Sequence, residues 1–119
     1  MKKILLGIVT IILFLGIVYT LTGQITHNRI QKRVAYWESL IDKEIPTGTR
    51  KENVEQWGQQ QHLKLEWIPS KNMLDANVEQ LPDAGIGFPC SSWNIIVDIY
   101  IGNDGSSLRR KVHSIGNCI

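Results

Sequence analysis

Residues 89–119 read PCSSWNIIVDIYIGNDGSSLRRKVHSIGNCI, and this stretch contains both cysteines of the chain, Cys90 and Cys118. Between the cysteines, two strand-like segments are separated by Asn-Asp-Gly at residues 103–105. A three-residue loop with glycine in the left-handed position joins the strands of an antiparallel hairpin. If the strands leave this loop without a shift in register, Cys90 lies opposite Cys118 at a spacing that suits a disulfide. The stretch therefore predicts a β-hairpin closed by a disulfide.

The unshifted register creates one conflict in the hairpin. It places Asp98 opposite Arg110, which is a favourable cross-strand pair, but it also places Val97 opposite Lys111 on the most apolar side. Either the aliphatic stem of the lysine lies along the edge of the core, or a β-bulge shifts the register by one residue. Both alternatives leave the two sulfur atoms within reach of each other.

The predicted disulfide indicates a cellular compartment. It would close a loop of about 28 residues and stabilise the domain by roughly 3–4 kcal/mol in the chain-entropy model. Disulfides of this kind persist outside the reducing cytosol. We therefore expect the domain to lie on the extracytoplasmic side of a membrane, in a bacterial periplasm.

Residues 4–23, ILLGIVTIILFLGIVYTLTG, contain no charged side chain. As a helix they extend about 30 Å, which matches the hydrocarbon core of a bilayer. A cleaved signal peptide is the alternative, but residues 19–24 lack the small residues of a cleavage site. We expect residues 1–23 to be an uncleaved, single-pass signal anchor in the bacterial inner membrane. The distribution of basic residues does not decide the orientation of the anchor, because they occur on both sides of it. Lys2 and Lys3 precede the anchor, and Arg29, Lys32 and Arg33 follow it.

The charge balance bears on the class of partner. The chain has 13 Lys and Arg and 11 Asp and Glu, and two of the basic residues are Lys2 and Lys3. The remainder of the chain therefore carries equal numbers of acidic and basic side chains. This balance does not favour nucleic acid as a partner.

Two helices are expected after the anchor. Residues 24–44 form a juxtamembrane amphipathic helix, which is compatible with a continuation of the membrane helix. Its apolar residues recur at spacings of three and four: Ile30, Val34, Trp37 and Ile41. Pro46 and Gly48 then interrupt the chain, and Thr49 with Glu52 predicts a capping box at the start of a short helix.

The remaining segments complete the predicted domain. Residues 63–68 alternate as a half-buried strand that ends at Pro69. Residues 73–81 fit a strand or a poor helix, with the strand preferred, and residues 82–89 read as a loop. The order predicts an α+β domain over residues 45–119, with two helices packed on one face of a three- or four-stranded antiparallel sheet.

Part of this pattern resembles a known family. The stretch IPTGTRKENVEQW, followed by strands and an Asn-Asp-Gly hairpin, resembles the small periplasmic domain of the SmpA/OmlA type over residues 45–115. That family includes the small lipoprotein of the outer-membrane β-barrel assembly machinery, so the resemblance implies a role in an envelope assembly complex. The chain departs from the family because it has no lipidated cysteine and has Gly58-Gln59-Gln60 in place of Gly-x-Pro. The matching positions are Ile45, Gly48, Thr49, Val54 and Trp57.

Candidate catalytic groups are few. His27, His62 and His113 are far apart and lack the spacing of a metal site, and no phosphate-binding glycine loop occurs. The cysteines have no histidine neighbour in the sequence that would activate a thiol. Asp98, on an otherwise apolar strand, is either a perturbed carboxylate or a structural partner of Arg110, and the structural pair is favoured. We expect no metal, no cofactor and no enzymatic activity.

These expectations favour a membrane-tethered domain that binds a protein. One role is that of an immunity protein that neutralises a toxin acting in the periplasm, and the alternative is an accessory subunit of an envelope or outer-membrane assembly complex. A small hydrolase that uses Asp98 or a histidine is the third possibility. The partner is expected to contact charged residues of the hairpin and a polar loop. The candidate contact residues are Asp75, Glu79, Asp83, Phe88, Arg109 and Lys111.

Overall fold

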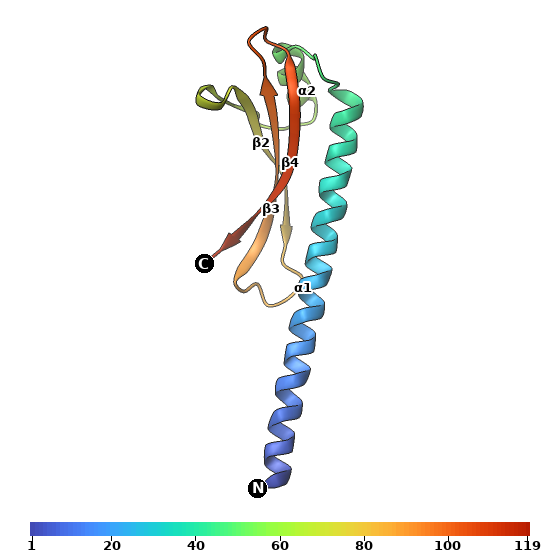
Figure 1. Cartoon of the computed structure of the whole chain (residues 1–119), viewed down its shortest axis with the longest axis vertical. Coiled ribbons are helices and arrows are strands. Elements are labelled where there is room, and N and C mark those ends of the chain that lie inside the picture. The colour runs from blue at the N-terminus through green and yellow to red at the C-terminus, as the bar shows by residue number, and fades with distance from the viewer.

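The computed structural model describes residues 1–119 and combines two helices with a four-stranded antiparallel sheet (Figure 1). The strands follow the spatial order β1-β2-β3-β4, so each strand pairs with its neighbour in sequence. This architecture confirms the predicted α+β class. The elements are α1 (Lys2–Glu44), α2 (Lys51–Gln60), β1 (Glu66–Ile68), the 3-10 turn η1 (Pro69–Lys71), β2 (Met73–Pro82), β3 (Cys90–Ile101) and β4 (Ser107–Cys118).

Helix α1 is one continuous helix of 43 residues in two environments. Its N-terminal half projects away from the rest of the molecule, and its C-terminal half lies along the sheet (Figure 1). The large apolar side chains of residues 4–21 are all exposed, and this part of α1 is long and apolar enough to cross a membrane. Farther along, Ile30, Trp37 and Ile41 are buried, as their spacing predicts. The segments predicted as the anchor and the juxtamembrane helix therefore form one continuous helix.

Helix α2 begins at Lys51 without the predicted capping box. No side chain caps its N-terminus; Thr49 instead donates its hydroxyl hydrogen to the Pro46 carbonyl. The Thr49 carbonyl accepts a hydrogen bond from the Ser107 N–H (2.7 Å), so the turn before α2 is held by the first residue of β4. This tertiary contact takes the place of the local cap. Gly48 allows the turn with φ of 93°.

The core lies on one face of the sheet. From β3 it takes Ile95, Val97 and Ile99, which are fully buried, and both helices pack against them. Val54 and Trp57 of α2 belong to the same core cluster as Ile41 of α1. Two helices on one face of the sheet are therefore confirmed.

The hairpin β3–β4 has the predicted pairing register at its two ends, but the register of its central residues is shifted. Cys90 lies opposite Cys118, with the Cα atoms 3.9 Å apart, and the two form a disulfide. Two bulges, one near each end, shift the central pairs by one residue. The shift places Val97 opposite Val112. The unshifted register is therefore wrong for the middle of the hairpin, and the bulge alternative is confirmed. The physical reason for the shift is that two valines meet in the core while Lys111 moves to the other face of the sheet.

Candidate functional site

The face of the sheet opposite the helices is open, because α1 and α2 both pack on the other face and the chain has no further long helix. Strand alternation and the observed register bring one residue from each strand into a single row across this open face. Three members of the row are carboxylic acids and the fourth is a lysine. From β1 to β4 the row is Glu66, Asp75, Asp98 and Lys111.

Asp98 is the most buried member of the row, with 6% of its surface exposed. Its Oδ2 lies 2.9 Å from Nε2 of His113, which comes from β4. The expected pair with Arg110 is wrong. The shifted register turns Arg110 to the helix-covered face, where it donates to the Asp42 carboxylate (2.7 Å) and to the Ile45 carbonyl.

The surroundings of Asp75 raise the pKa of its carboxyl group. Burial, a hydrogen bond with the Asp98 carboxyl and the charge of Asp98 raise the pKa of Asp75 to about 6. Glu66 raises this pKa further, whereas the charge of His113 lowers it. At mildly acidic pH, Asp75 therefore keeps a proton and hydrogen-bonds to Asp98.

Asp75→Asn replaces the carboxyl group that carries this raised pKa. Between pH about 4 and about 6 the folded protein holds a proton on Asp75 that the unfolded chain has released, so this group's contribution to stability falls as pH rises through that window. Asparagine keeps a hydrogen-bond donor toward Asp98 but cannot ionise. We therefore expect the variant to be more stable than wild type at pH 7, by about 1 kcal/mol after allowance for solvent screening. That corresponds to a rise of about 4–8 °C in Tm.

The measurement is thermal unfolding of the full chain in detergent at pH 4.5 and pH 7, followed by tryptophan fluorescence. The difference in Tm between variant and wild type should be larger at pH 7 than at pH 4.5. Glu38→Gln is the control, since Glu38 is exposed on α1 and forms no salt bridge. Equal differences at both pH values would show that Asp75 ionises normally.

The open face also carries aromatic, basic and apolar side chains around the acidic row. The Arg109 guanidinium lies 4.2 Å from the centre of the Tyr100 ring, next to the row. Lys111 and Arg109 are exposed, and so is Ile115 farther along β4, with 50% of its surface in contact with solvent. Aromatic and arginine side chains with a polar surround are typical of protein interfaces.

The structure places the predicted contact residues in three different regions. It brings Asp75, Arg109 and Lys111 together on the open face. Glu79 instead lies on the helix-covered face, because a bulge between Asn77 and Glu79 reverses the alternation of β2. There the Glu79 carboxylate accepts hydrogen bonds from Arg33 (2.7 Å) and from the indole N–H of Trp37 (3.1 Å).

Asp83 and Phe88 lie in the loop between β2 and β3, residues 83–89. Asp83 accepts hydrogen bonds from the backbone N–H groups of Gly85 and Gly87, and these bonds lower its pKa. Its carboxylate therefore shapes the loop. Phe88 is exposed, and neither residue belongs to a strand of the open face.

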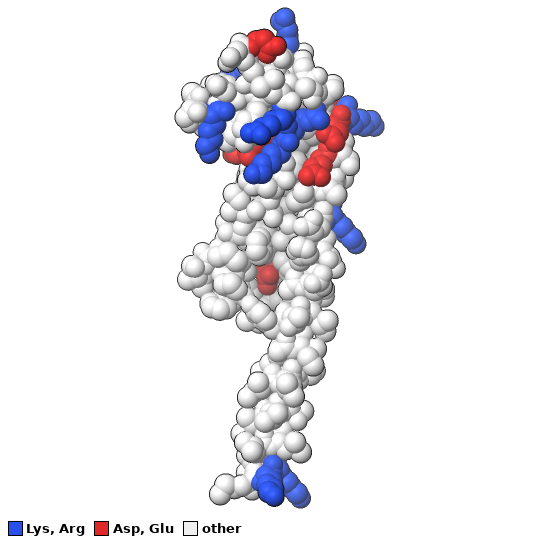
Figure 2. Space-filling view, in the orientation of Figure 1, with Lys and Arg blue, Asp and Glu red and all other residues white.

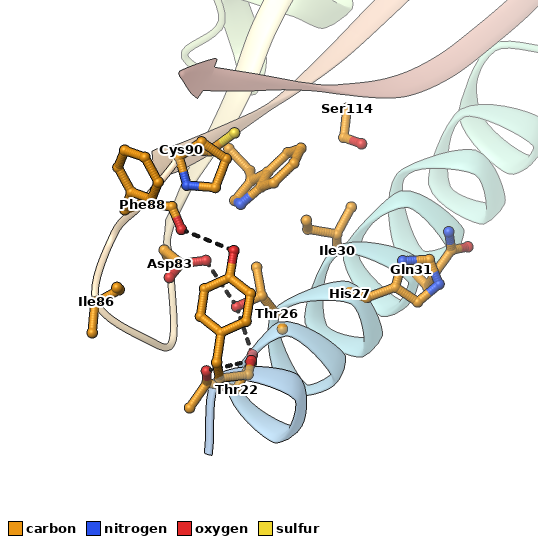
Figure 3. A pocket seen from close by; sticks show the side chains of 14 residues that line it. Thr22, Thr26, His27, Ile30, Gln31, Asp83, Ile86, Phe88, Cys90 and Ser114 are labelled. Atoms are coloured by element: carbon orange, nitrogen blue, oxygen red, sulfur yellow. Dashed lines mark hydrogen bonds between the residues drawn. The ribbon is translucent and has the colours of Figure 1, made fainter. Parts of the chain in front are cut away.

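A cleft of about 410 Å³ separates this loop from α1 (Figure 3). Tyr19, Thr22 and Thr26 line its helix side, and Asp83 and Phe88 line its loop side. Asp83 is its only carboxylate, and the hydrogen bonds from Gly85 and Gly87 already engage it. The cleft therefore combines apolar and polar side chains with one carboxylate, which the loop backbone already engages.

Two features of the site could not be predicted from the sequence patterns. The contact of Asp98 with His113 depends on the bulged register, and so does the placement of Tyr100 beside Arg109. His113 has Asp98 as its only side-chain partner, and no hydroxyl or thiol lies within hydrogen-bond distance of the imidazole. Nowhere in the structure do three or more His, Cys, Asp or Glu side chains gather in a way that could hold a metal ion.

Comparisons with protein-family models, with curated proteins and with solved structures find no match to this chain. The function of the chain is therefore inferred from its residues and their geometry.

Proposed function

We propose that the chain is a protein-binding domain tethered to the bacterial inner membrane by residues 1–23, with the rest of the chain in the periplasm. The exposed apolar half of α1 supports the tether, and the disulfide between Cys90 and Cys118 supports an oxidising compartment. The surface that would bind a partner is the open face of the sheet.

The observation that carries this proposal is that the helices leave one whole face of the sheet uncovered. That face combines a carboxylate row with Lys111 and with Arg109 stacked on Tyr100. Side chains of this kind contribute to recognition through charge complementarity and aromatic contact. We propose that the partner contacts Arg109 and Lys111 at the β4 edge and Asp75 nearer the centre.

Two roles fit a small tethered domain with such a face. The first is an immunity protein that neutralises a toxin acting in the periplasm, where a tether keeps the inhibitor at the site of attack. The second is an accessory subunit of an envelope or outer-membrane assembly complex, which the resemblance to the SmpA/OmlA-type domain implies. Both roles are non-catalytic and need no cofactor.

The test is affinity capture of the intact, tagged protein from detergent-solubilised membranes, followed by identification of what is bound. The double variant Arg109→Glu/Lys111→Glu reverses the charge at the β4 edge and should recover at least about tenfold less partner. The control is Lys43→Glu/Arg50→Glu, which makes the same charge change at exposed positions near the ends of the two helices. The control should recover the wild-type amount.

The captured protein separates the two roles. A toxin, together with restored growth when toxin and chain are co-expressed, identifies an immunity protein, whereas membrane or envelope subunits identify an accessory role. Equal recovery with both variants would show that the open face is not the binding surface. A turnover activity lost in a folded Asp98→Asn protein would instead favour the hydrolase alternative.

A further inference from the structure

The loop of residues 83–89 folds back along α1 to the level of the membrane segment. Ala84 donates its backbone N–H to the Thr26 hydroxyl (2.9 Å), and the Tyr19 hydroxyl donates to the Phe88 carbonyl (3.4 Å). At 1.5 Å per residue, Tyr19 lies about 24 Å along the helix from Lys3, whereas the uncharged segment ends about 30 Å from it. The tip of the loop therefore lies at the level where residues 4–23 leave the hydrocarbon core.

This loop tip is apolar and exposed. Ile86 has 80% of its surface exposed and Phe88 has 59%, and neither is covered by the rest of the chain. The Asp83 carboxylate holds the loop in shape through the backbone N–H groups of Gly85 and Gly87. Two large apolar side chains are thus presented on a fixed loop.

Most charges of the molecule lie away from this end, and Asp83 is the one charged side chain of the loop itself. Figure 2 shows Lys, Arg, Asp and Glu concentrated toward the end of the domain far from the N-terminus, with a largely uncharged surface nearer the membrane segment. Residues 84–97 contain no charged side chain, and residues 4–28 of α1 contain no Lys, Arg, Asp or Glu. An uncharged surface with exposed apolar groups suits the boundary between lipid headgroups and acyl chains.

We propose that the loop of residues 83–89 docks on the lipid surface of the membrane that α1 crosses, with Ile86 and Phe88 inserted below the headgroups. The inference rests on the proposed membrane tether. Because α1 already holds the loop beside the bilayer, weak insertion is enough to keep it there. Docking then holds the domain against the bilayer in one orientation, in which the open face of the sheet points sideways and remains free for a partner.

The two phenylalanines of the chain make this inference directly testable, because one lies in each region of interest. Phe14 lies near the middle of residues 4–23, and Phe88 lies in the loop. The full chain is labelled with 4-fluorophenylalanine, placed in lipid nanodiscs and observed by fluorine NMR. Phe14→Leu and Phe88→Leu assign the two resonances.

Three relaxation agents then report the position of each ring: a lipid spin-labelled near the end of the acyl chain, a lipid spin-labelled just below the headgroup, and a water-soluble gadolinium chelate. We expect the deep label to broaden Phe14 and the shallow label to broaden Phe88, while the chelate affects neither strongly. Ile86→Glu should reduce the shallow-label broadening of Phe88 at least about threefold and leave Phe14 unchanged. Leu108→Glu is the matched control, since Leu108 is 59% exposed at the opposite end of the sheet.

The outcomes separate the tether from the loop. If the deep label does not broaden Phe14, the membrane tether itself is wrong. If Phe14 behaves as expected but the chelate broadens Phe88 and the shallow label does not, the tether stands and lipid docking of the loop is overturned. Protection of Phe88 from both lipid label and chelate would show that a protein surface, such as a second copy of the chain, covers the loop.

Discussion

Replacing both cysteines, Cys90→Ala with Cys118→Ala, is expected to lower the free energy of unfolding by about 3–4 kcal/mol. The disulfide closes a separation of 28 residues and joins the open ends of β3 and β4, far from the turn that joins the other ends. Without it the unfolded chain regains the freedom of that loop, and β4, an edge strand, can fray from its last residue. Small domains are stable by about 5–15 kcal/mol in all, so the loss is a large fraction.

The measurement is unfolding of the full chain in guanidinium chloride and detergent micelles, followed by the fluorescence of its four tryptophans. The wild-type protein with a reductant present throughout is the matched control and should unfold at the same midpoint as the double variant. A double variant within about 0.5 kcal/mol of the oxidised wild type would show that the bond does not constrain the native domain.

Ile41→Ala should be nearly as damaging, with an expected loss of about 2–5 kcal/mol. Ile41 lies in the last turns of α1, is 1% exposed and belongs to the core cluster with Ile99 of β3. Truncation removes buried methyl and methylene groups and leaves a cavity that the rigid helix and the sheet fill only in part.

The matched control for this substitution is Ile25→Ala on the same helix, since 45% of Ile25 is exposed. It should cost less than about 1 kcal/mol in the same unfolding measurement. Comparable losses at the two positions would contradict the burial of Ile41 between α1 and the sheet. The pair of variants thus tests whether the inward-facing side of α1 is part of the folded core.

Local patterns predict much of this fold. An uncharged run in residues 4–23, a three-and-four spacing through Ile41 and a glycine loop at Gly105 are each contained in a short stretch. The structure confirms the helix, the core positions and the hairpin that they predict. Their physical basis is local, since each depends on the periodicity of one element or on the conformation of one turn.

The rest depends on contacts between elements. Thr49 reads as a helix cap, but its backbone is held by Ser107, 58 residues later, and the helix begins at Lys51. Glu79 faces α1 because of a bulge in β2, and the residue types of that strand do not indicate a bulge. Packing of the sheet against the helices decides such details.

The candidate site was the least predictable part for the same reason. Asp98 and His113 meet only because the hairpin shifts by one residue between its two fixed ends. Under the unshifted register, Asp98 would face Arg110 on the same side of the sheet. A one-residue shift between two bulges therefore changes which residues share the open face, although the strands and the disulfide stay the same.

The redox state of the cysteines in membranes from growing cells tests both the disulfide and the compartment. Samples are quenched in acid, denatured and treated with a maleimide of high mass before and after reduction, so that each free thiol shifts the protein on a gel. With the domain on the oxidising side of the membrane and the Cys90–Cys118 bond formed, no thiol should react before reduction and two should react afterwards. Two reactive thiols before reduction would contradict both the bond and the compartment.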